Sequence, residues 1–86
     1  MFVRSDAHAA LGAAIRHARS ERGMSQERLG LESGLDRTYV GGIERGERNP
    51  SYGNLIKIAD CLETPLSQII RDAEQNSPPR SARPPA

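Results

Sequence analysis

MSQERLGLESGLDRTYVGGIERGERNPS, residues 24–51, contains two short helical patterns separated by a glycine. Ser25 and Asp36 each precede one pattern, and both residue types are strongly preferred as helix N-caps. The first helix is expected to end at Gly34, because glycine adopts a positive φ without a Cβ clash. The small residue Gly30 allows the two helices to approach each other closely. The stretch therefore predicts two helices that cross at a tight turn.

Three further helices are predicted around this pair. One begins at Asp6 and ends at Gly23, the next begins at Ser51, and the last begins with Thr64 as N-cap, followed by a proline at the first helical position. Apolar residues recur at helical spacing in all three: Leu11, Ala14, Ile15 and Ala18, then Leu55, Ile58, Ala59 and Leu62, then Leu66, Ile69, Ile70 and Ala73. The chain contains no strand pattern, so the sequence predicts an all-α fold of five helices.

A chain of 86 residues has room for one domain. Residues 1–6 are predicted to form a flexible N-terminal arm, and residues 7–74 a folded domain. Residues 75–86 contain proline and arginine without periodicity, which predicts a disordered tail.

Composition excludes several classes of protein. No apolar run approaches the roughly 18 residues that span a membrane, and the N-terminus lacks the apolar stretch of a secretory signal. Cys61 is the single cysteine, so an internal disulfide is impossible and a cytoplasmic location is expected. The net charge of +1 supports a nucleic-acid partner only weakly, so that hypothesis depends on where the arginines lie.

Two runs carry a family resemblance: LDRTY at residues 35–39 and IERGERNPS at residues 43–51. They resemble the Xre/Cro/cI family of lambda-repressor-like helix-turn-helix proteins, and within it the controller proteins of restriction–modification systems. The resemblance covers about residues 9–72. It implies a compact five-helix lambda-repressor-like DNA-binding domain, with the helix-turn-helix at helices 2 and 3 and the third helix in the DNA major groove.

The resemblance also implies roles for individual residues. Arg37 and Thr38 match positions that contact base edges, and they lie at the N-terminal end of the third helix, where such a helix meets the bases. Arginine there favours the O6 and N7 atoms of guanine. Arg19 and Glu44 match a structural ion pair between the first helix and the end of the third. Positions that contact the DNA backbone are matched by Gln26, Tyr39, Arg48 and Asn49, and the hydroxyl of Ser25, beside Gln26, can add a further backbone contact.

Gly41 and Gly42 depart from the family, which usually has polar residues at these positions. Two interpretations are open: the backbone approaches DNA closely, which only glycine permits, or direct readout is weak and specificity depends on Arg37, Thr38 and DNA shape. The second is favoured. It predicts that Gly42→Ala raises thermal stability, because glycine costs about 1 kcal/mol relative to alanine inside a helix, and that it changes operator selectivity little.

The last helix has an apolar stripe that could form a dimer interface. Leu66, Ile69 and Ile70 are the candidate residues. Ile69 and Ile70 are adjacent, so one is expected to face inward while the other stays exposed. An exposed apolar patch favours self-association, and the family resemblance also implies a homodimer.

The sequence therefore predicts a homodimeric transcriptional regulator that binds a near-palindromic operator in double-stranded DNA, with control of restriction–modification as the implied context. Two alternatives stay open: the antitoxin of a toxin–antitoxin pair, and a protein-interaction adaptor without DNA binding. No enzyme, metal, cofactor or small-molecule ligand is expected, because no catalytic or metal-binding motif is present.

Overall fold

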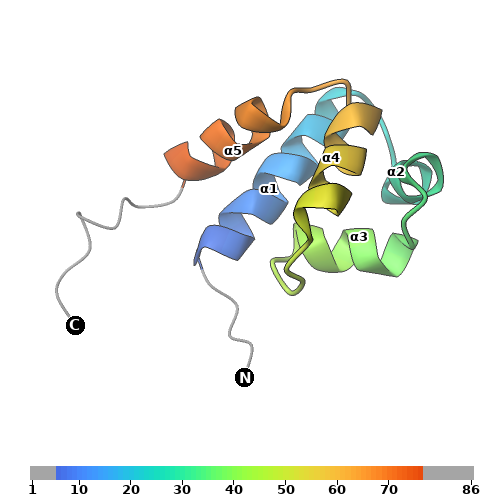
Figure 1. Ribbon diagram of the computed structural model, residues 1–86, viewed down its shortest axis with the longest axis horizontal. Coiled ribbons are helices and arrows are strands. Elements are labelled where there is room, and N and C mark those ends of the chain that lie inside the picture. The colour runs from blue at the N-terminus through green and yellow to red at the C-terminus, as the bar shows by residue number, and fades with distance from the viewer. Residues whose placement is uncertain (1–5, 77–86) are drawn as a thin grey trace, which may run out of the picture.

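A computed structural model describes residues 6–76, and the predicted all-α fold is confirmed (Figure 1). Five helices follow one another in these residues, without a strand. They are α1 (Asp6–Glu21), α2 (Gln26–Ser33), α3 (Arg37–Glu44), α4 (Tyr52–Cys61) and α5 (Leu66–Gln75). The helices extend one residue beyond the predicted domain at each end. The rest of the predicted arm and tail, residues 1–5 and 77–86, lies outside the described residues.

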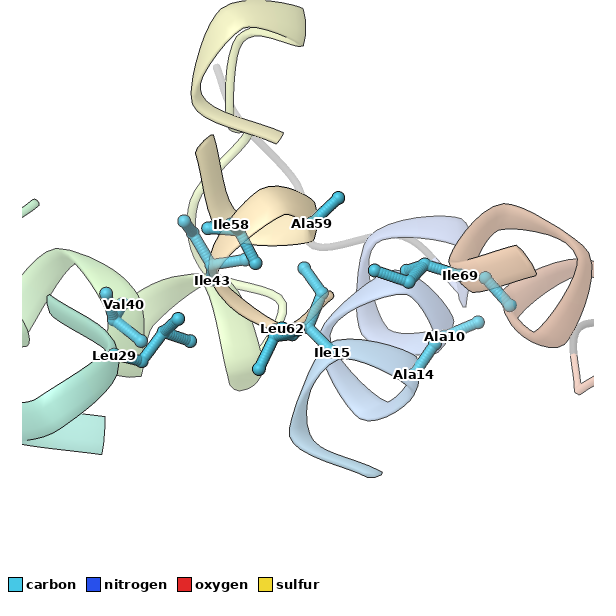
Figure 2. Packing of buried hydrophobic residues seen from close by; sticks show 11 residues of the cluster. Ala10, Ala14, Ile15, Leu29, Val40, Ile43, Ile58, Ala59, Leu62 and Ile69 are labelled. Atoms are coloured by element: carbon cyan, nitrogen blue, oxygen red, sulfur yellow. The ribbon is translucent and has the colours of Figure 1, made fainter. Parts of the chain in front are cut away.

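The long helix α1 connects two parts of the domain. It packs against α5 on one side and α3 on another, while α2 contacts both α3 and α4. Leu29 of α2 and Val40 of α3 point toward each other in Figure 2, and Ile69 of α5 lies beside Ala10 of α1. One core joins all five helices, with its buried hydrophobic residues being Ala10, Ala14, Ile15, Leu29, Val40, Ile43, Ile58, Ala59, Leu62, Ile69 and Ala73.

The predicted N-caps at Ser25, Asp36 and Ser51 are confirmed. The Ser25 hydroxyl accepts a backbone N–H at 3.0 Å, the Asp36 carboxylate accepts one at 2.8 Å, and the Ser51 hydroxyl accepts one at 3.1 Å. Each cap satisfies a donor that the first turn of a helix leaves unpaired. The starts of α2, α3 and α4 are therefore fixed by local sequence.

The predicted cap at Thr64 is wrong. Pro65 occupies the N-cap position of α5, without a side-chain cap bond. The Thr64 hydroxyl instead donates to the Leu62 carbonyl at 3.0 Å, at the end of α4. The threonine thus stabilises the turn that leaves α4, and α5 begins one residue later than expected.

None of the helices within residues 6–76 has the length and apolar composition needed to cross a membrane.

Candidate nucleic-acid interface

The turn between α2 and α3 brings the two helices into close contact. Gly34 has a φ of 75°, the left-handed conformation expected there. A Cβ on Gly30 would lie 2.7 Å from the Leu35 carbonyl oxygen, so a larger residue could not fit. Leu29 and Val40 are fully buried between the helices. The inner face of α3 is therefore fixed against α2.

The first turn of α3 is presented to solvent. Arg37 and Thr38 are both exposed, directly after the Asp36 cap. The cap orders this turn without covering it. The two residues predicted to contact bases therefore lie together on an accessible and ordered helix end.

The last turn of α3 is buried and ionically paired. Arg19 Nε lies 2.7 Å from Glu44 Oε2, and Arg19 Nη2 donates to Glu44 Oε1 at 3.0 Å. Arg19 Nη1 also donates to the Met24 carbonyl at 2.7 Å. The hydrogen bond to Glu44 raises the pKa of Arg19. The ion pair expected between these residues is thus present, and it joins α1, the turn before α2 and the end of α3.

Glu44 also holds Gln26, a contact that the sequence did not reveal. Gln26 Nε2 donates to Glu44 Oε1 at 2.9 Å. A glutamine amide has two N–H donors. One donates to Glu44, and the other can donate to a second acceptor. The Arg19–Glu44 pair therefore orients the amide that was predicted to contact phosphate.

Gly41 and Gly42, for which close approach to DNA and weak readout stay open, are buried beside arginine side chains. A Cβ on Gly42 would lie 2.7 Å from Arg48 Cγ, and one on Gly41 would lie 3.0 Å from Arg45 Nη1. Both glycines are buried. Their missing side chains make room for the Arg45 guanidinium and the Arg48 stem, which lie against α3 at these positions.

Tyr39 is connected to α4 by a second contact that the sequence did not reveal. Asn54 Nδ2 donates to Tyr39 Oη at 3.1 Å, and both residues are half-buried. The Tyr39 side chain packs against the core cluster. The hydroxyl predicted to contact phosphate is therefore fixed by an asparagine from another helix.

Comparisons with known proteins agree with this geometry. The helix-turn-helix family model matches residues 15–69. The chain belongs to the helix-turn-helix family. The control protein C.SmaI of Serratia marcescens is 41% identical over 56 residues, which are 65% of this chain and 67% of that protein. The transcriptional regulator SutR of Escherichia coli is 38% identical over 74 residues, 86% of this chain.

A solved structure gives the same result. The restriction-modification controller protein C.AhdI of Aeromonas hydrophila superimposes with a TM-score of 0.70 and 44% identity, covering 71% of this chain and 92% of that one. The predicted resemblance to controller proteins is thereby confirmed. The chain spans 67% of C.SmaI but only 38% of SutR.

Other predicted interface residues of this helix-turn-helix domain lie at its surface. Ser25 and Asn49 are exposed, one at the start of α2 and the other in the loop between α3 and α4. Arg48 lies in that same loop, and its stem crosses Gly42. The loop therefore adjoins α3 through the arginine side chain.

The expected dimer residues divide into two groups. Ile69 is 1% exposed and belongs to the core, so its inclusion in an interface is wrong. Its side chain points toward α1, as Figure 2 shows, because α1 and α5 pack against each other. Leu66 and Ile70 are half-buried and retain accessible apolar surface. As expected, one of the two adjacent isoleucines, Ile69, faces inward, and the other, Ile70, stays partly exposed.

Proposed function

We propose that this protein is a DNA-binding transcriptional regulator that acts as a homodimer on a near-palindromic operator. The observation that carries the proposal is the exposed first turn of α3, which is ordered by the Asp36 cap and supported from behind by α2. The second helix of a helix-turn-helix inserts this end into the major groove. The names of C.SmaI and SutR, a control protein and a transcriptional regulator, support the same role.

Arg37 and Thr38 contact base edges in this proposal. An arginine at the N-terminal end of a recognition helix can donate two hydrogen bonds to one guanine. Thr38 offers a hydroxyl and a methyl group, which suit either a polar base edge or the methyl group of thymine. These two side chains give the domain its direct sequence discrimination.

Contacts to phosphate hold the domain in register on the DNA. Gln26 and Tyr39 offer neutral donors that the protein itself orients, through Glu44 and Asn54 respectively. Arg48 adds a cation from the loop after α3, and Ser25 and Asn49 add polar groups at the same surface. Phosphate contacts determine orientation and affinity without selecting sequence.

Two copies of the domain associate through α5. Leu66 and Ile70 leave apolar surface accessible beside the core, which self-association would cover. A two-fold dimer contacts two half-sites about one helical turn apart, so its operator is near-palindromic. The controller proteins among the relatives support control of restriction–modification genes as the biological context.

The proposal is tested by binding to DNA from upstream of the protein's own gene, measured by mobility shift across a range of salt concentrations. Arg37→Ala is expected to lower both affinity and the ratio between operator and unrelated DNA. Arg48→Ala is expected to weaken binding to all sequences alike and to reduce the salt dependence. Arg16→Ala is the matched control, because it removes the same charge from an exposed position on α1 that the proposal assigns neither to the DNA contacts nor to the dimer.

The outcomes distinguish the parts of the proposal. A folded protein that shifts no DNA at low salt would overturn DNA binding and favour a protein-interaction adaptor. Binding as a monomer to a single half-site, shown by sedimentation of the complex, would overturn the dimer. A toxin encoded by the neighbouring gene and bound by this chain would favour the antitoxin alternative.

A further inference from the structure

The contact between α3 and α4 defines the position of one hydroxyl group. Tyr39 packs its ring against the core, and its Oη accepts a hydrogen bond from Asn54 Nδ2 at 3.1 Å. Asn54 is itself fixed in place, because its backbone N–H donates to the Ser51 cap at 3.1 Å. The donor and the acceptor are therefore both held by the first turn of α4 and the body of α3.

The direction of this hydrogen bond has a chemical consequence. A phenolic oxygen can accept hydrogen bonds, but it has only one hydrogen to donate. The Asn54 amide nitrogen supplies the hydrogen to the bond between them, so the hydrogen of Tyr39 stays available for another acceptor. Phosphate oxygens of DNA only accept hydrogen bonds. Tyr39 can therefore serve a phosphate only while its hydrogen is not used within the protein.

We propose that Asn54 is a positioning residue that keeps the Tyr39 hydroxyl hydrogen directed outward, toward a DNA phosphate. Asn54 acts through Tyr39 and needs no DNA contact of its own. This inference rests on the proposed function, because it assigns a donor direction to one of the phosphate contacts. It adds α4 to the elements that determine how α3 docks on DNA.

A double-mutant cycle tests the inference. Operator affinity is measured for the full chain and for Tyr39→Phe, Asn54→Ala and the variant with both changes. Each single change is expected to weaken binding by about three- to tenfold per subunit, the value of one hydrogen bond. The double variant is expected to match Tyr39→Phe within about twofold, because Asn54 has nothing left to position.

Asn54→Asp reverses the polarity of the contact. A carboxylate only accepts, so it draws the Tyr39 hydrogen inward and removes the donor. The added negative charge also repels phosphate, and the same change in a Tyr39→Phe background measures that repulsion alone. Asn54→Asp is expected to weaken binding beyond this repulsion by about the factor seen for Tyr39→Phe.

Thermal unfolding of each variant separates positioning from general stabilisation. A merely structural Asn54 would lower the unfolding midpoint and weaken operator binding equally in both backgrounds, which would overturn the inference. An operator affinity of Asn54→Ala equal to that of the unchanged chain would also overturn it. Failure of the proposed function is distinct, because the unchanged chain would then not bind operator DNA at all.

Discussion

The two ends of α3 differ in how they are held. At the C-terminal end, Ile43 and Glu44 are buried, and Glu44 receives hydrogen bonds from two other segments. At the N-terminal end, Arg37 and Thr38 are exposed, and the turn is ordered by the Asp36 cap and by backbone packing against Gly30 of α2. One end of the helix is therefore anchored in the protein, whereas the other is left free to contact a partner.

The anchored end is built from contacts with α1. Arg19 forms the buried ion pair with Glu44. About two helical turns before Arg19, Gly12 crosses α3 so closely that a Cβ would lie 2.5 Å from the Glu44 carbonyl oxygen and closer still to that of Ile43. The position of the exposed turn therefore depends on contacts at the far end of the same helix.

The largest expected effect comes from breaking the ion pair. Arg19→Met leaves the Glu44 carboxylate, whose side chain is 2% exposed, without its partner. Loss of one partner from a buried pair costs about 3–5 kcal/mol, and we expect the free energy of unfolding to fall by about this amount in urea denaturation. Operator affinity should fall too, because Glu44, which accepts the hydrogen bond from Gln26, is no longer held in place by Arg19.

Two variants check the cause of that loss. Arg28→Ala breaks an exposed pair with Glu32 and should cost less than about 1 kcal/mol. Replacing Arg19 and Glu44 together with methionine removes the unpaired charge and should recover much of the stability. An equal loss for the single and double replacements would show that the charge is not the cause.

The next effect tests the helix crossing. Gly12→Ala places a methyl group against two backbone carbonyl oxygens that cannot move independently. Overpacking of this kind costs about 1–3 kcal/mol, and we expect a value near the upper limit because α1 itself must shift. Gly53→Ala is the control, since its nearest neighbour is Ser51 Oγ at 3.9 Å. That substitution should stabilise α4, so a loss in both variants would contradict the crossing argument.

The features that could be predicted from sequence are local ones. The caps at Ser25, Asp36 and Ser51 each involve residues within one turn, and Gly34 marks a turn whose backbone only glycine adopts readily. Such features depend on short segments of chain, which carry their own signals. The Arg19–Glu44 pair is not local, and only the family resemblance indicated it.

The features that could not be predicted depend on how helices cross. The tertiary structure determines the contacts of Gly12 and Asn54 and the Gln26–Glu44 hydrogen bond, because each forms only when two helices meet at a particular distance and angle. Gly42 shows the same limit, because its neighbour Arg48 lies six residues away in a loop whose path is set by tertiary packing. Ile69 and Ile70 could be separated only after α5 was seen to pack on α1.

A smaller effect concerns the free end of α3. Asp36→Ala removes the acceptor for the Thr38 backbone N–H, and loss of an N-cap costs about 1 kcal/mol. We expect a lower unfolding midpoint and weaker operator binding, because the first turn of α3 frays. Asp36→Asn keeps an acceptor while removing the charge, and should preserve the midpoint. Unequal stability of the two variants with equal binding would show that the turn orders on DNA regardless of its cap.

The smallest expected effect on stability is at Gly42, where a gain in helix preference and a steric clash oppose each other. Alanine inside a helix is favoured over glycine by about 1 kcal/mol, but a Cβ on Gly42 would lie 2.7 Å from Arg48 Cγ. Arg48 is exposed and its side chain can move, so the clash is relieved by displacing that stem from α3. The sequence alone predicted a higher unfolding midpoint for Gly42→Ala, but with Arg48 against the glycine we expect an unchanged midpoint. We also expect an operator affinity lowered toward that of Arg48→Ala.

The same substitution in the Arg48→Ala background separates the helix preference of alanine from the clash with the arginine. Without the arginine stem, Gly42→Ala meets no clash and should raise stability by about 1 kcal/mol, the full helix preference. Its effect on operator binding should then vanish, because the residue it displaces is absent. Equal gains in stability in both backgrounds would mean that Arg48 does not rest on the glycine in solution, and Gly42 would then be exposed backbone. The comparison thus decides whether the second turn of α3 presents DNA with an arginine or with a bare helix.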